Sequence, residues 1–270
     1  MEILPLATSG PHIYLLSRYR LSQLMIHGAF ICALLMSAIQ TLYADEIKIA
    51  VASNFSPTMT VISRQFEKST GHKVKLIPGS TGKHYAQIHH GAPFDLFFAA
   101  DRERPQRLEE EGLAIVDSRF TYAIGKVVLW SPDKHLIDSQ GKVLQQDSIR
   151  YLAIANPKLA PYGIAARQIL QKIGLWQHYQ GRLVRGENIA QTYQFVKTGN
   201  ATLGFVAYSQ IKADSTLSGS YWIAPQDLYT PIEQQAILLK DTPAARAFMT
   251  FMRLPEIIVL IKSRGYELPE

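Results

Sequence analysis

The first apolar run of the chain is short, and polar capping residues follow it directly. Ile47–Ala52 form the run, and Ser53 and Asn54 come next. This pattern predicts a buried strand that leads into a helix. In Pro57–Thr70 apolar residues recur three and four positions apart, and Gly71 follows. We therefore expect an amphipathic helix that ends at a left-handed glycine.

The same order of strand, loop and helix continues along the chain. Val74–Ile77 predicts a second strand, Pro78–Gly82 a tight loop and Lys83–His90 a helix. Phe94–Ala100 predicts a third strand. The order β-α-β-α-β predicts a parallel sheet with right-handed crossovers, and ligands bind such sheets outside the carboxyl ends of the strands.

The second half of the chain repeats this alternation. Further apolar runs of strand type lie at 121–130, 151–155, 183–184, 203–206 and 234–239. A loop is expected at 156–163, and helices are expected at 164–172, 244–252 and 255–264. The pattern predicts an α/β protein of two Rossmann-like lobes.

The predicted lobes are discontinuous in sequence. Residues 45–124 and 233–270 are assigned to the first lobe and residues 125–232 to the second. No low-complexity linker and no sequence repeat separates them. Two strands that cross between the lobes fit this pattern better than a flexible tether.

Four predicted loop-to-helix transitions face one another in this arrangement. They are Ser53-Asn54, Ser80-Thr81, Tyr162-Gly163 and Asn188-Ile189. A helix N-terminus exposes unpaired N–H groups and a partial positive charge, so several of them together bind an anion without lysine or arginine. A site of donors alone favours a fully deprotonated anion, since a protonated one brings an O–H group without an acceptor, at about 1–3 kcal/mol.

Each of these residues also has a structural interpretation. Ser53, Asn54 and Ser80 are common helix caps, Tyr162 follows a proline as turn residues do, and Ile189 suits a core position. The sequence pattern alone leaves these alternatives open.

Composition and charge narrow the class of partner. The 270 residues are 47% hydrophobic and 19% charged, with a formal net charge of +6 and a pI near 9.3. These are the values of a globular protein. The basic residues are scattered and no nucleic-acid-binding motif is present, so we expect no nucleic acid partner. The charge would steer a small anion without specifying it.

The N-terminus predicts export. Arg18 and Arg20 precede the apolar run 30–36, and the chain turns polar at Asp45. Residues 1–44 are therefore interpreted as a signal peptide with Ala44 as its last residue, which places the mature protein in the periplasm. An uncleaved anchor is the alternative interpretation, and Met25 is an alternative start.

The single cysteine, Cys32, lies within this leader. The mature chain then has no disulfide, no thiolate metal site and no cysteine nucleophile.

Other motifs carry less chemistry. His84, His89 and His90 lack metal-ligand spacing and are expected on a solvated helix face, as is Lys83. The segment Gly79–Lys83 lacks P-loop spacing, and no G-x-S-x-G motif occurs, so hydrolytic chemistry has little support.

An ordered set of short motifs covers nearly all of residues 45–270. The motifs are Ala52-Ser53-Asn54-Phe55, Gly79-Ser80-Thr81-Gly82-Lys83, Tyr85-Ala86-Gln87-Ile88, Gly91-Ala92-Pro93-Phe94-Asp95-Leu96-Phe97, Thr121-Tyr122-Ala123-Ile124-Gly125-Lys126, Asn156-Pro157, Ala160-Pro161-Tyr162-Gly163, Leu203-Gly204-Phe205-Val206-Ala207 and Ile261-Lys262-Ser263-Arg264-Gly265-Tyr266. In this order they resemble the periplasmic molybdate-binding proteins of ABC transporters.

The resemblance implies a fold, a ligand and a partner. The fold is that of a type II periplasmic binding protein, whose two lobes close on molybdate or tungstate and deliver it to a membrane permease. The chain would be a monomer, would not be an enzyme and would need no cofactor, and no protein atom would contact molybdenum directly.

The resemblance also implies the ligand residues. These are Ser53, Asn54 and Ser80, with the backbone N–H groups of Tyr162 and Ile189. Some members have a ligand tyrosine at the position that Ala207 occupies here. Tyr208 follows it, and in a subgroup with asparagine after the first serine or threonine, Asn54 can take the missing role.

Three alternatives remain. The first is a binder of sulfate, phosphate or another oxyanion, since sequence does not measure a cavity. The second is a transferase that uses the same fold, as porphobilinogen deaminase does, but it needs a cofactor-bearing cysteine. The third is a regulatory effector domain, which would lack an export signal. Sequence does not rank molybdate against tungstate.

Overall fold

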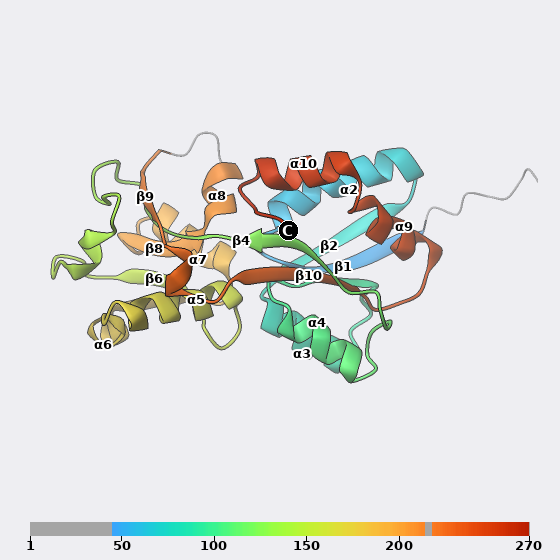
Figure 1. The fold of residues 1–270 in the computed structure, drawn as a ribbon, viewed down its shortest axis with the longest axis horizontal. Helices are drawn as coiled ribbons and strands as arrows, with labels where there is room; N and C mark the ends of the chain where they lie inside the picture. The colour runs from blue at the N-terminus through green and yellow to red at the C-terminus, as the bar shows by residue number, and fades with distance from the viewer. Residues whose placement is uncertain (1–44, 214–217, 270) are drawn as a thin grey trace, which may run out of the picture. The chain divides into compact units, whose positions relative to one another are not determined.

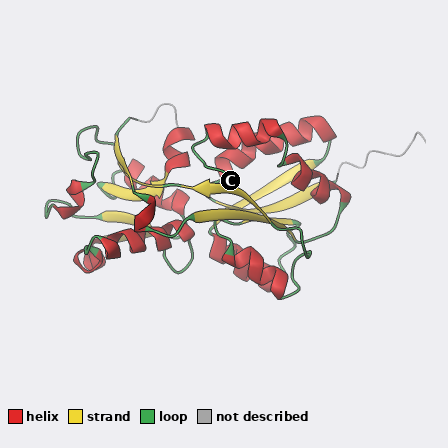
Figure 2. Ribbon diagram, viewed as in Figure 1, coloured by secondary structure: helices red, strands yellow, loops and turns green. Residues whose placement is uncertain are grey.

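The computed structural model describes residues 45–213 and 218–269 (Figure 1), and the predicted signal peptide lies outside this range. Strands and helices alternate along the described chain, and helices flank the strands (Figure 2). Among these residues no helix is long and apolar enough to cross a membrane. The strands form two five-stranded sheets.

The first sheet has the order β2-β1-β3-β10-β4. Its strands are β1 (Glu46–Ala52), β2 (Lys73–Gly79), β3 (Leu96–Phe98), β4 (Phe120–Gly125) and β10 (Ile232–Leu238). β1 runs parallel to β2 and β3, whereas β10 runs antiparallel to β3 and β4. The parallel strands end at one edge, which is where Ser53 and Ser80 follow.

The second sheet has the order β7-β6-β8-β5-β9 and the same plan. Its strands are β5 (Val127–Ser131), β6 (Leu152–Ala155), β7 (Leu183–Gly186), β8 (Leu203–Ala207) and β9 (Ser220–Ile223). β6 is parallel to β7 and β8, and β5 is antiparallel to β8 and β9. The α/β fold of two similar lobes is thereby confirmed.

Helices cover both faces of each sheet. Successive strand residues point to opposite faces, so the apolar residues of one strand pack against helices on both sides. The helices are α2 (Ser56–Thr70), α3 (Thr81–His89), α4 (Glu103–Glu110), α5 (Pro161–Lys172), α6 (Trp176–Tyr179), α7 (Ile189–Lys197), α8 (Tyr208–Ala213), α9 (Pro243–Phe251) and α10 (Pro255–Ser263). In β1, Ile49 packs with Met59 of α2 and Phe248 of α9. The adjacent Ala50 packs on the other face with Ile88 of α3.

The chain passes between the sheets twice, from β4 to β5 and from β9 to β10. The single strand expected at 121–130 is therefore wrong: it is two strands in different sheets, separated at Lys126. A continuous apolar run cannot reveal this change, because both strands are buried. The second crossing strand, β10, has an irregular register between Gln234 and Gln235.

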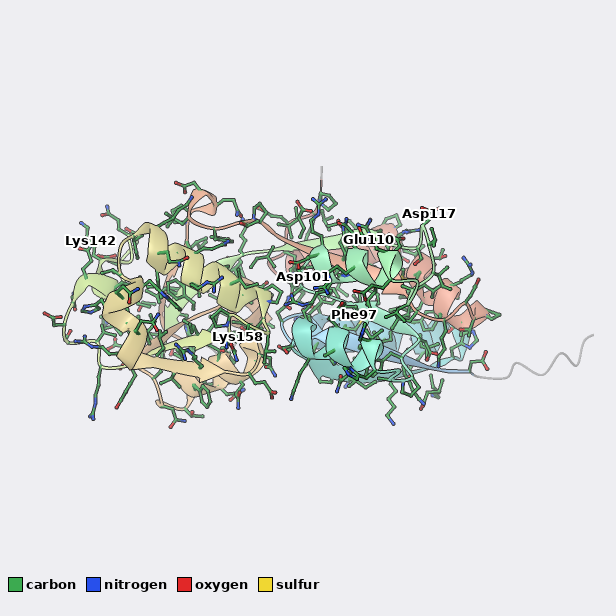
Figure 3. The ribbon with its side chains drawn as sticks, turned by 90° about the horizontal axis from the view of Figure 1, so that it is seen from below. Phe97, Asp101, Glu110, Asp117, Lys142 and Lys158 are labelled. Atoms are coloured by element: carbon green, nitrogen blue, oxygen red, sulfur yellow. The ribbon has the colours of Figure 1, made fainter. Side chains whose placement is uncertain are left out.

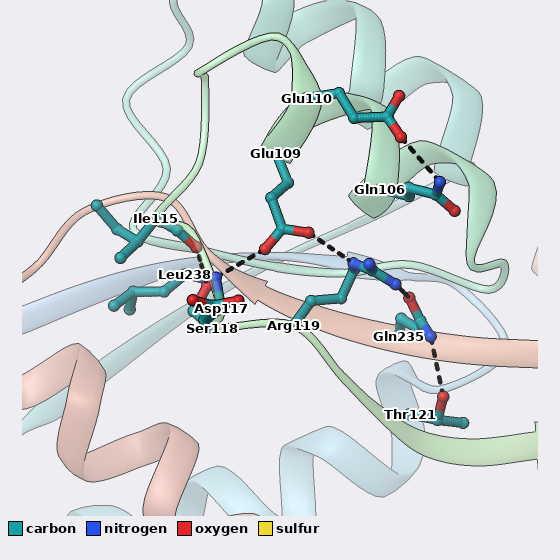
Figure 4. Close-up of polar contacts among 10 residues, drawn as sticks. All are labelled: Gln106, Glu109, Glu110, Ile115, Asp117, Ser118, Arg119, Thr121, Gln235 and Leu238. Atoms are coloured by element: carbon teal, nitrogen blue, oxygen red, sulfur yellow. Dashed lines mark hydrogen bonds and ion pairs between the residues drawn. The ribbon is translucent and has the colours of Figure 1, made fainter.

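The two glutamines at this irregularity have different partners. Gln234 is fully buried beneath the loop after β1, where Asn54 donates to it. Gln235 accepts from Arg119 and donates to Thr121, and Arg119 in turn donates to Glu109 of α4 (Figure 4). Both crossing strands are thus tied to the first lobe.

Several expected boundaries were wrong. The loop expected at 78–82 is only Ser80, because β2 continues through Gly79 and α3 begins at Thr81. The loop expected at 156–163 is shorter, because α5 begins at Pro161. Proline at the first helical position needs no N–H partner, so it marks a start that was placed too late. The predicted left-handed Gly71 is confirmed, with φ 79°.

Candidate anion-binding site

All five residues named from the sequence surround one small cavity between the ends of the two sheets. The lining residues are Ala52, Ser53, Asn54, Gly79, Ser80, Thr81, Ala100, Ala160, Pro161, Tyr162, Asn188 and Ile189. None of them carries a formal charge at neutral pH. The cavity volume is about 10 Å³, against about 350 Å³ for the neighbouring groove beside Asp101. A space of this size holds about one water molecule and excludes an organic solute of sugar or amino-acid size.

The first lobe contributes two buried hydroxyl groups. Ser80 is the N-cap of α3, and its Oγ accepts from the backbone N–H of Lys83 at 3.3 Å. Ser53 follows β1, and its Oγ accepts from the backbone N–H of Ala190 at 3.4 Å. The two side chains lie in residues only 3% and 6% exposed. Each hydroxyl keeps its own O–H free to donate, because in both contacts the serine Oγ is the acceptor.

Thr81 makes a further hydrogen bond beside the cavity that the sequence did not predict. Its Oγ1 accepts from the backbone N–H of Ala100 at 2.9 Å, which ties the start of α3 to the end of β3. Both residues line the cavity. The sequence did offer one indication of this contact. Ala100 ends the third expected strand, and the ends of the parallel strands are where a ligand is expected.

The second lobe contributes helix N-termini rather than side-chain donors. Tyr162 is in the first turn of α5 behind Pro161, and Ile189 is the first residue of α7. The N-cap Asn188 accepts from the backbone N–H of Gln191 at 3.0 Å. Within the described residues, no acceptor is found for the backbone N–H groups of Tyr162 and Ile189. These are first-turn donors that a helix leaves unpaired.

The Asn54 side chain is turned away from this role. Its Nδ2 donates to Gln234 at 2.7 Å and to the Tyr266 hydroxyl at 3.3 Å, and that hydroxyl donates to the Asn54 carbonyl at 2.9 Å. With its amide donors engaged in the interior, Asn54 would contribute a backbone N–H group rather than its amide to an anion. The amide holds the loop in place.

The Tyr162 phenol lies at the crossing strands, while its backbone lies at the cavity. A Cβ at Gly125 would approach this hydroxyl to 2.2 Å and Nε2 of Gln234 to 3.1 Å. Burial raises the pKa of Tyr162 well above its ordinary value. The phenol is therefore neutral, and the surroundings of the cavity carry no tyrosinate charge.

Position 207 departs from the ligand tyrosine that the resemblance suggested. Neither Ala207 nor Tyr208 lines the cavity. Tyr208 packs against Tyr221, with ring centroids 6.0 Å apart. Gln210 instead links this region to the site: its Oε1 accepts from the N–H of Ala207, and its Nε2 donates to the Ile189 carbonyl at 3.1 Å. Gln210 thus braces the start of α7.

The nearest charged groups are paired with one another. Lys83 forms an ion pair with Glu187, and both side chains are about half exposed. Asp101, at the start of α4 (Figure 3), pairs with Arg104. Burial raises the pKa of the Asp101 carboxyl, although the charge of Arg104 opposes this shift.

The expectation of a solvated histidine face was wrong for His84. This residue is 2% exposed, and its imidazole lies against Gly79, where an added Cβ would be 2.6 Å from Nε2. Burial lowers the pKa of His84, so it is neutral. His89 and His90 are exposed as expected. In residues 45–213 and 218–269, no group of three or more potential metal ligands is present.

Comparison with known proteins agrees with this geometry. The family model of bacterial extracellular solute-binding proteins matches residues 47–267. The chain is 51% identical to the molybdate-binding protein ModA of Azotobacter vinelandii over 229 residues, which are 83% of this chain and 91% of that protein. It is 45% identical to ModA of Rhodobacter capsulatus over 242 residues, 88% of this chain and 95% of that protein.

A solved structure, the periplasmic molybdate-binding protein of Azotobacter vinelandii, has the same fold. It superposes with a TM-score of 0.79 at 43% identity and covers 83% of this chain and 100% of its own. The family match at residues 47–267 spans both lobes and every loop that lines the cavity. The chain belongs to the family of bacterial extracellular solute-binding proteins, whose members capture solutes and are not enzymes.

Proposed function

We propose that this protein binds molybdate in the cavity between its lobes and delivers it to the membrane permease of an ABC transporter. The observation that carries the proposal is the convergence of helix N-termini and two serine hydroxyls on a cavity without a charged side chain. Such a site supplies donors only, so it suits a fully deprotonated oxyanion. The names of two relatives, both molybdate-binding proteins, support the choice of anion.

The proposed donors come from both lobes. Ser53 and Ser80 donate through their hydroxyls, and Asn54, Tyr162 and Ile189 through their backbone N–H groups. Tungstate has nearly the same size and charge as molybdate, so we propose that it binds in the same way. Molybdenum would be coordinated by its own oxygen atoms, and no protein atom would contact it.

The proposed cellular role follows from the same family. Residues 1–44 act as an export signal, and the mature chain works as a periplasmic monomer. Its lobes comprise residues 45–124 with 233–270, and residues 125–232. Sheet membership supports this division, because β4 and β10 belong to the first sheet and β5 to the second.

Titration calorimetry with the mature chain, residues 45–270, tests the proposal. We expect one site per chain, similar affinities for molybdate and tungstate, and much weaker binding of sulfate and phosphate. Phosphate should bind weakly because at neutral pH it retains a proton that finds no acceptor in the site. Tightest binding to sulfate would show that the chain is a sulfate binder.

A further inference from the structure

Within residues 45–213 and 218–269, three polar contacts join the lobes beside the cavity, and a further ion pair, Lys126 with Glu267, joins them at the crossing strands. The backbone N–H of Gly82 donates to the carbonyl of Leu159 at 2.8 Å, and the N–H of Ala190 donates to Oγ of Ser53 at 3.4 Å. Lys83 and Glu187 form the third contact, an ion pair. The last two involve side chains, which can change rotamer. The contact of Gly82 with Leu159 joins two backbones.

Both backbones of that contact are held by their own lobes. Gly82 is in the first turn of α3, behind the capping Ser80. Leu159 belongs to a turn in which its N–H donates to the carbonyl of Asn156 at 3.0 Å, and the N–H of Ala160 donates to the same carbonyl at 2.9 Å. Neither segment can yield without breaking these bonds. Closer approach of the lobes at this contact, here called the stop, would break bonds in one segment or the other.

Gly82 leaves no room for a side chain at this stop. A Cβ would lie 2.8 Å from the Leu159 carbonyl oxygen, 3.1 Å from its Cα and 3.3 Å from Nη2 of Arg104. Its backbone is helical rather than left-handed, so glycine is not needed for its conformation. Glycine is a poor helix residue, and alanine would favour α3. The close approach of the other lobe is what excludes alanine.

Gly82 also lies outside the lining of the cavity. It neighbours Thr81, which does line it, so the separation of the lobes at Gly82 affects the width of the cavity directly. A contact that limits closure without contacting the anion determines which anion fits.

We propose that the backbone contact between Gly82 and Leu159 sets how far the lobes close, and thereby selects the size of the bound oxyanion. This inference rests on the proposed function. A methyl group at position 82 holds the lobes apart by roughly half an ångström, since ordinary contacts to carbon begin near 3.4 Å. Closure then becomes too loose for a small anion and less favourable for a large one.

The test compares Gly82→Ala with Gly181→Ala, whose added Cβ would meet nothing within 4 Å. For each variant we would measure the affinities for molybdate and sulfate, the latter by competition, and the melting temperature without ligand. Gly82→Ala should bind molybdate about tenfold more weakly and sulfate more weakly still. Its ligand-free melting temperature should stay level or rise by about 2–4 °C, because the helix gains alanine. Gly181→Ala should leave both affinities unchanged.

Each result bears on a distinct claim. If Gly82→Ala binds molybdate as tightly as the unmodified chain, the contact does not limit closure. If the affinities for molybdate and sulfate fall by the same factor, the contact does not select the size of the anion. A fall in ligand-free melting temperature would show that Gly82 serves the stability of its own lobe instead. Failure of the unmodified chain to bind molybdate refutes the proposed function, independently of any variant.

Discussion

The two sides of the cavity use different chemistry for the same task. On the first lobe, Ser53 and Ser80 present side-chain hydroxyls from buried positions. On the second lobe, Tyr162 and Ile189 present only backbone N–H groups. The Ile189 side chain is buried in the apolar core, and the Tyr162 phenol reaches the crossing strands beside Gly125. Both sides use helix N-termini, but replacing a side chain by alanine can remove a donor only on the first.

In the proposed set of donors, a binding residue need not have a polar side chain. Ile189 has an apolar, buried side chain, and yet its N–H faces the cavity from the start of α7. An alanine scan would find the first lobe and overlook the second. Variants at Ile189 and Ser80 separate backbone donors from side-chain donors.

The largest effect is expected from Ile189→Pro. Proline removes the N–H but suits the first position of a helix, and Asn188 before it is already extended, with φ −142° and ψ 174°. Loss of a hydrogen bond to an anion should weaken molybdate binding by about 1.5–3 kcal/mol, or roughly 10–150-fold. Calorimetry on Ile189→Pro and Ile189→Ala would measure this. If alanine is as damaging as proline, the side chain matters and the N–H does not.

The next effect is that of Ser80→Ala on the first lobe. Loss of the hydroxyl donor should weaken binding by about 1–2 kcal/mol. The same change removes the N-cap of α3 and should lower the free energy of unfolding by about 0.5–2 kcal/mol.

Thr242→Ala is a matched control for Ser80→Ala. Thr242 caps α9, where its Oγ1 accepts from the N–H of Ala245, and it lies outside the cavity. It should lose similar stability, measured by urea unfolding, and keep full affinity. If Ser80→Ala and Thr242→Ala bind molybdate with equal affinity, Ser80 is only a capping residue.

His84 links the stability of the first lobe to pH. Burial lowers its pKa below the ordinary value of 6.5. The unfolded chain therefore binds a proton that the folded chain resists, and the free energy of unfolding should fall as pH drops below about 6.5. Urea unfolding between pH 5 and pH 8 should show a shallower dependence for His84→Gln than for the exposed control His90→Gln. Identical slopes in these two variants would contradict the assignment.

The smallest effect is expected from Lys83→Met. The Lys83 ammonium is half exposed and paired with Glu187, and exposed ion pairs contribute about 0–1 kcal/mol. Molybdate affinity should fall by less than about fivefold, and the difference should shrink in 0.5 M salt. A loss as large as that of Ile189→Pro would mean that the cation takes part in binding, and that the site is not built from neutral donors.

The sequence predicted the α/β order and placed Ser53, Ser80 and Ile189 at loop-to-helix transitions, because these depend on local periodicity and capping chemistry, but it placed the start of α5 too late. It placed the boundary between the lobes at residues 124 and 125, but it did not show that the run 121–130 is two separate strands, since two buried strands in succession look like one. It placed His84 on a solvated face, because the contacts of His84 with Phe94 and Phe97 arise from the packing of α3 on the first sheet, which local periodicity does not show. It also could not show that the Asn54 amide is engaged by Gln234 and Tyr266, which are far along the sequence.

The most direct test of the account is a crystal structure of the mature chain with molybdate, with molybdenum located by its anomalous scattering. We expect a single strong peak between Ser80 and Tyr162, with oxygen atoms within hydrogen-bonding distance of the Ser53 and Ser80 hydroxyls and of the N–H groups of Tyr162 and Ile189. A peak in the neighbouring groove beside Asp101, or contact of the anion with the Lys83 ammonium, would contradict a site made of neutral donors.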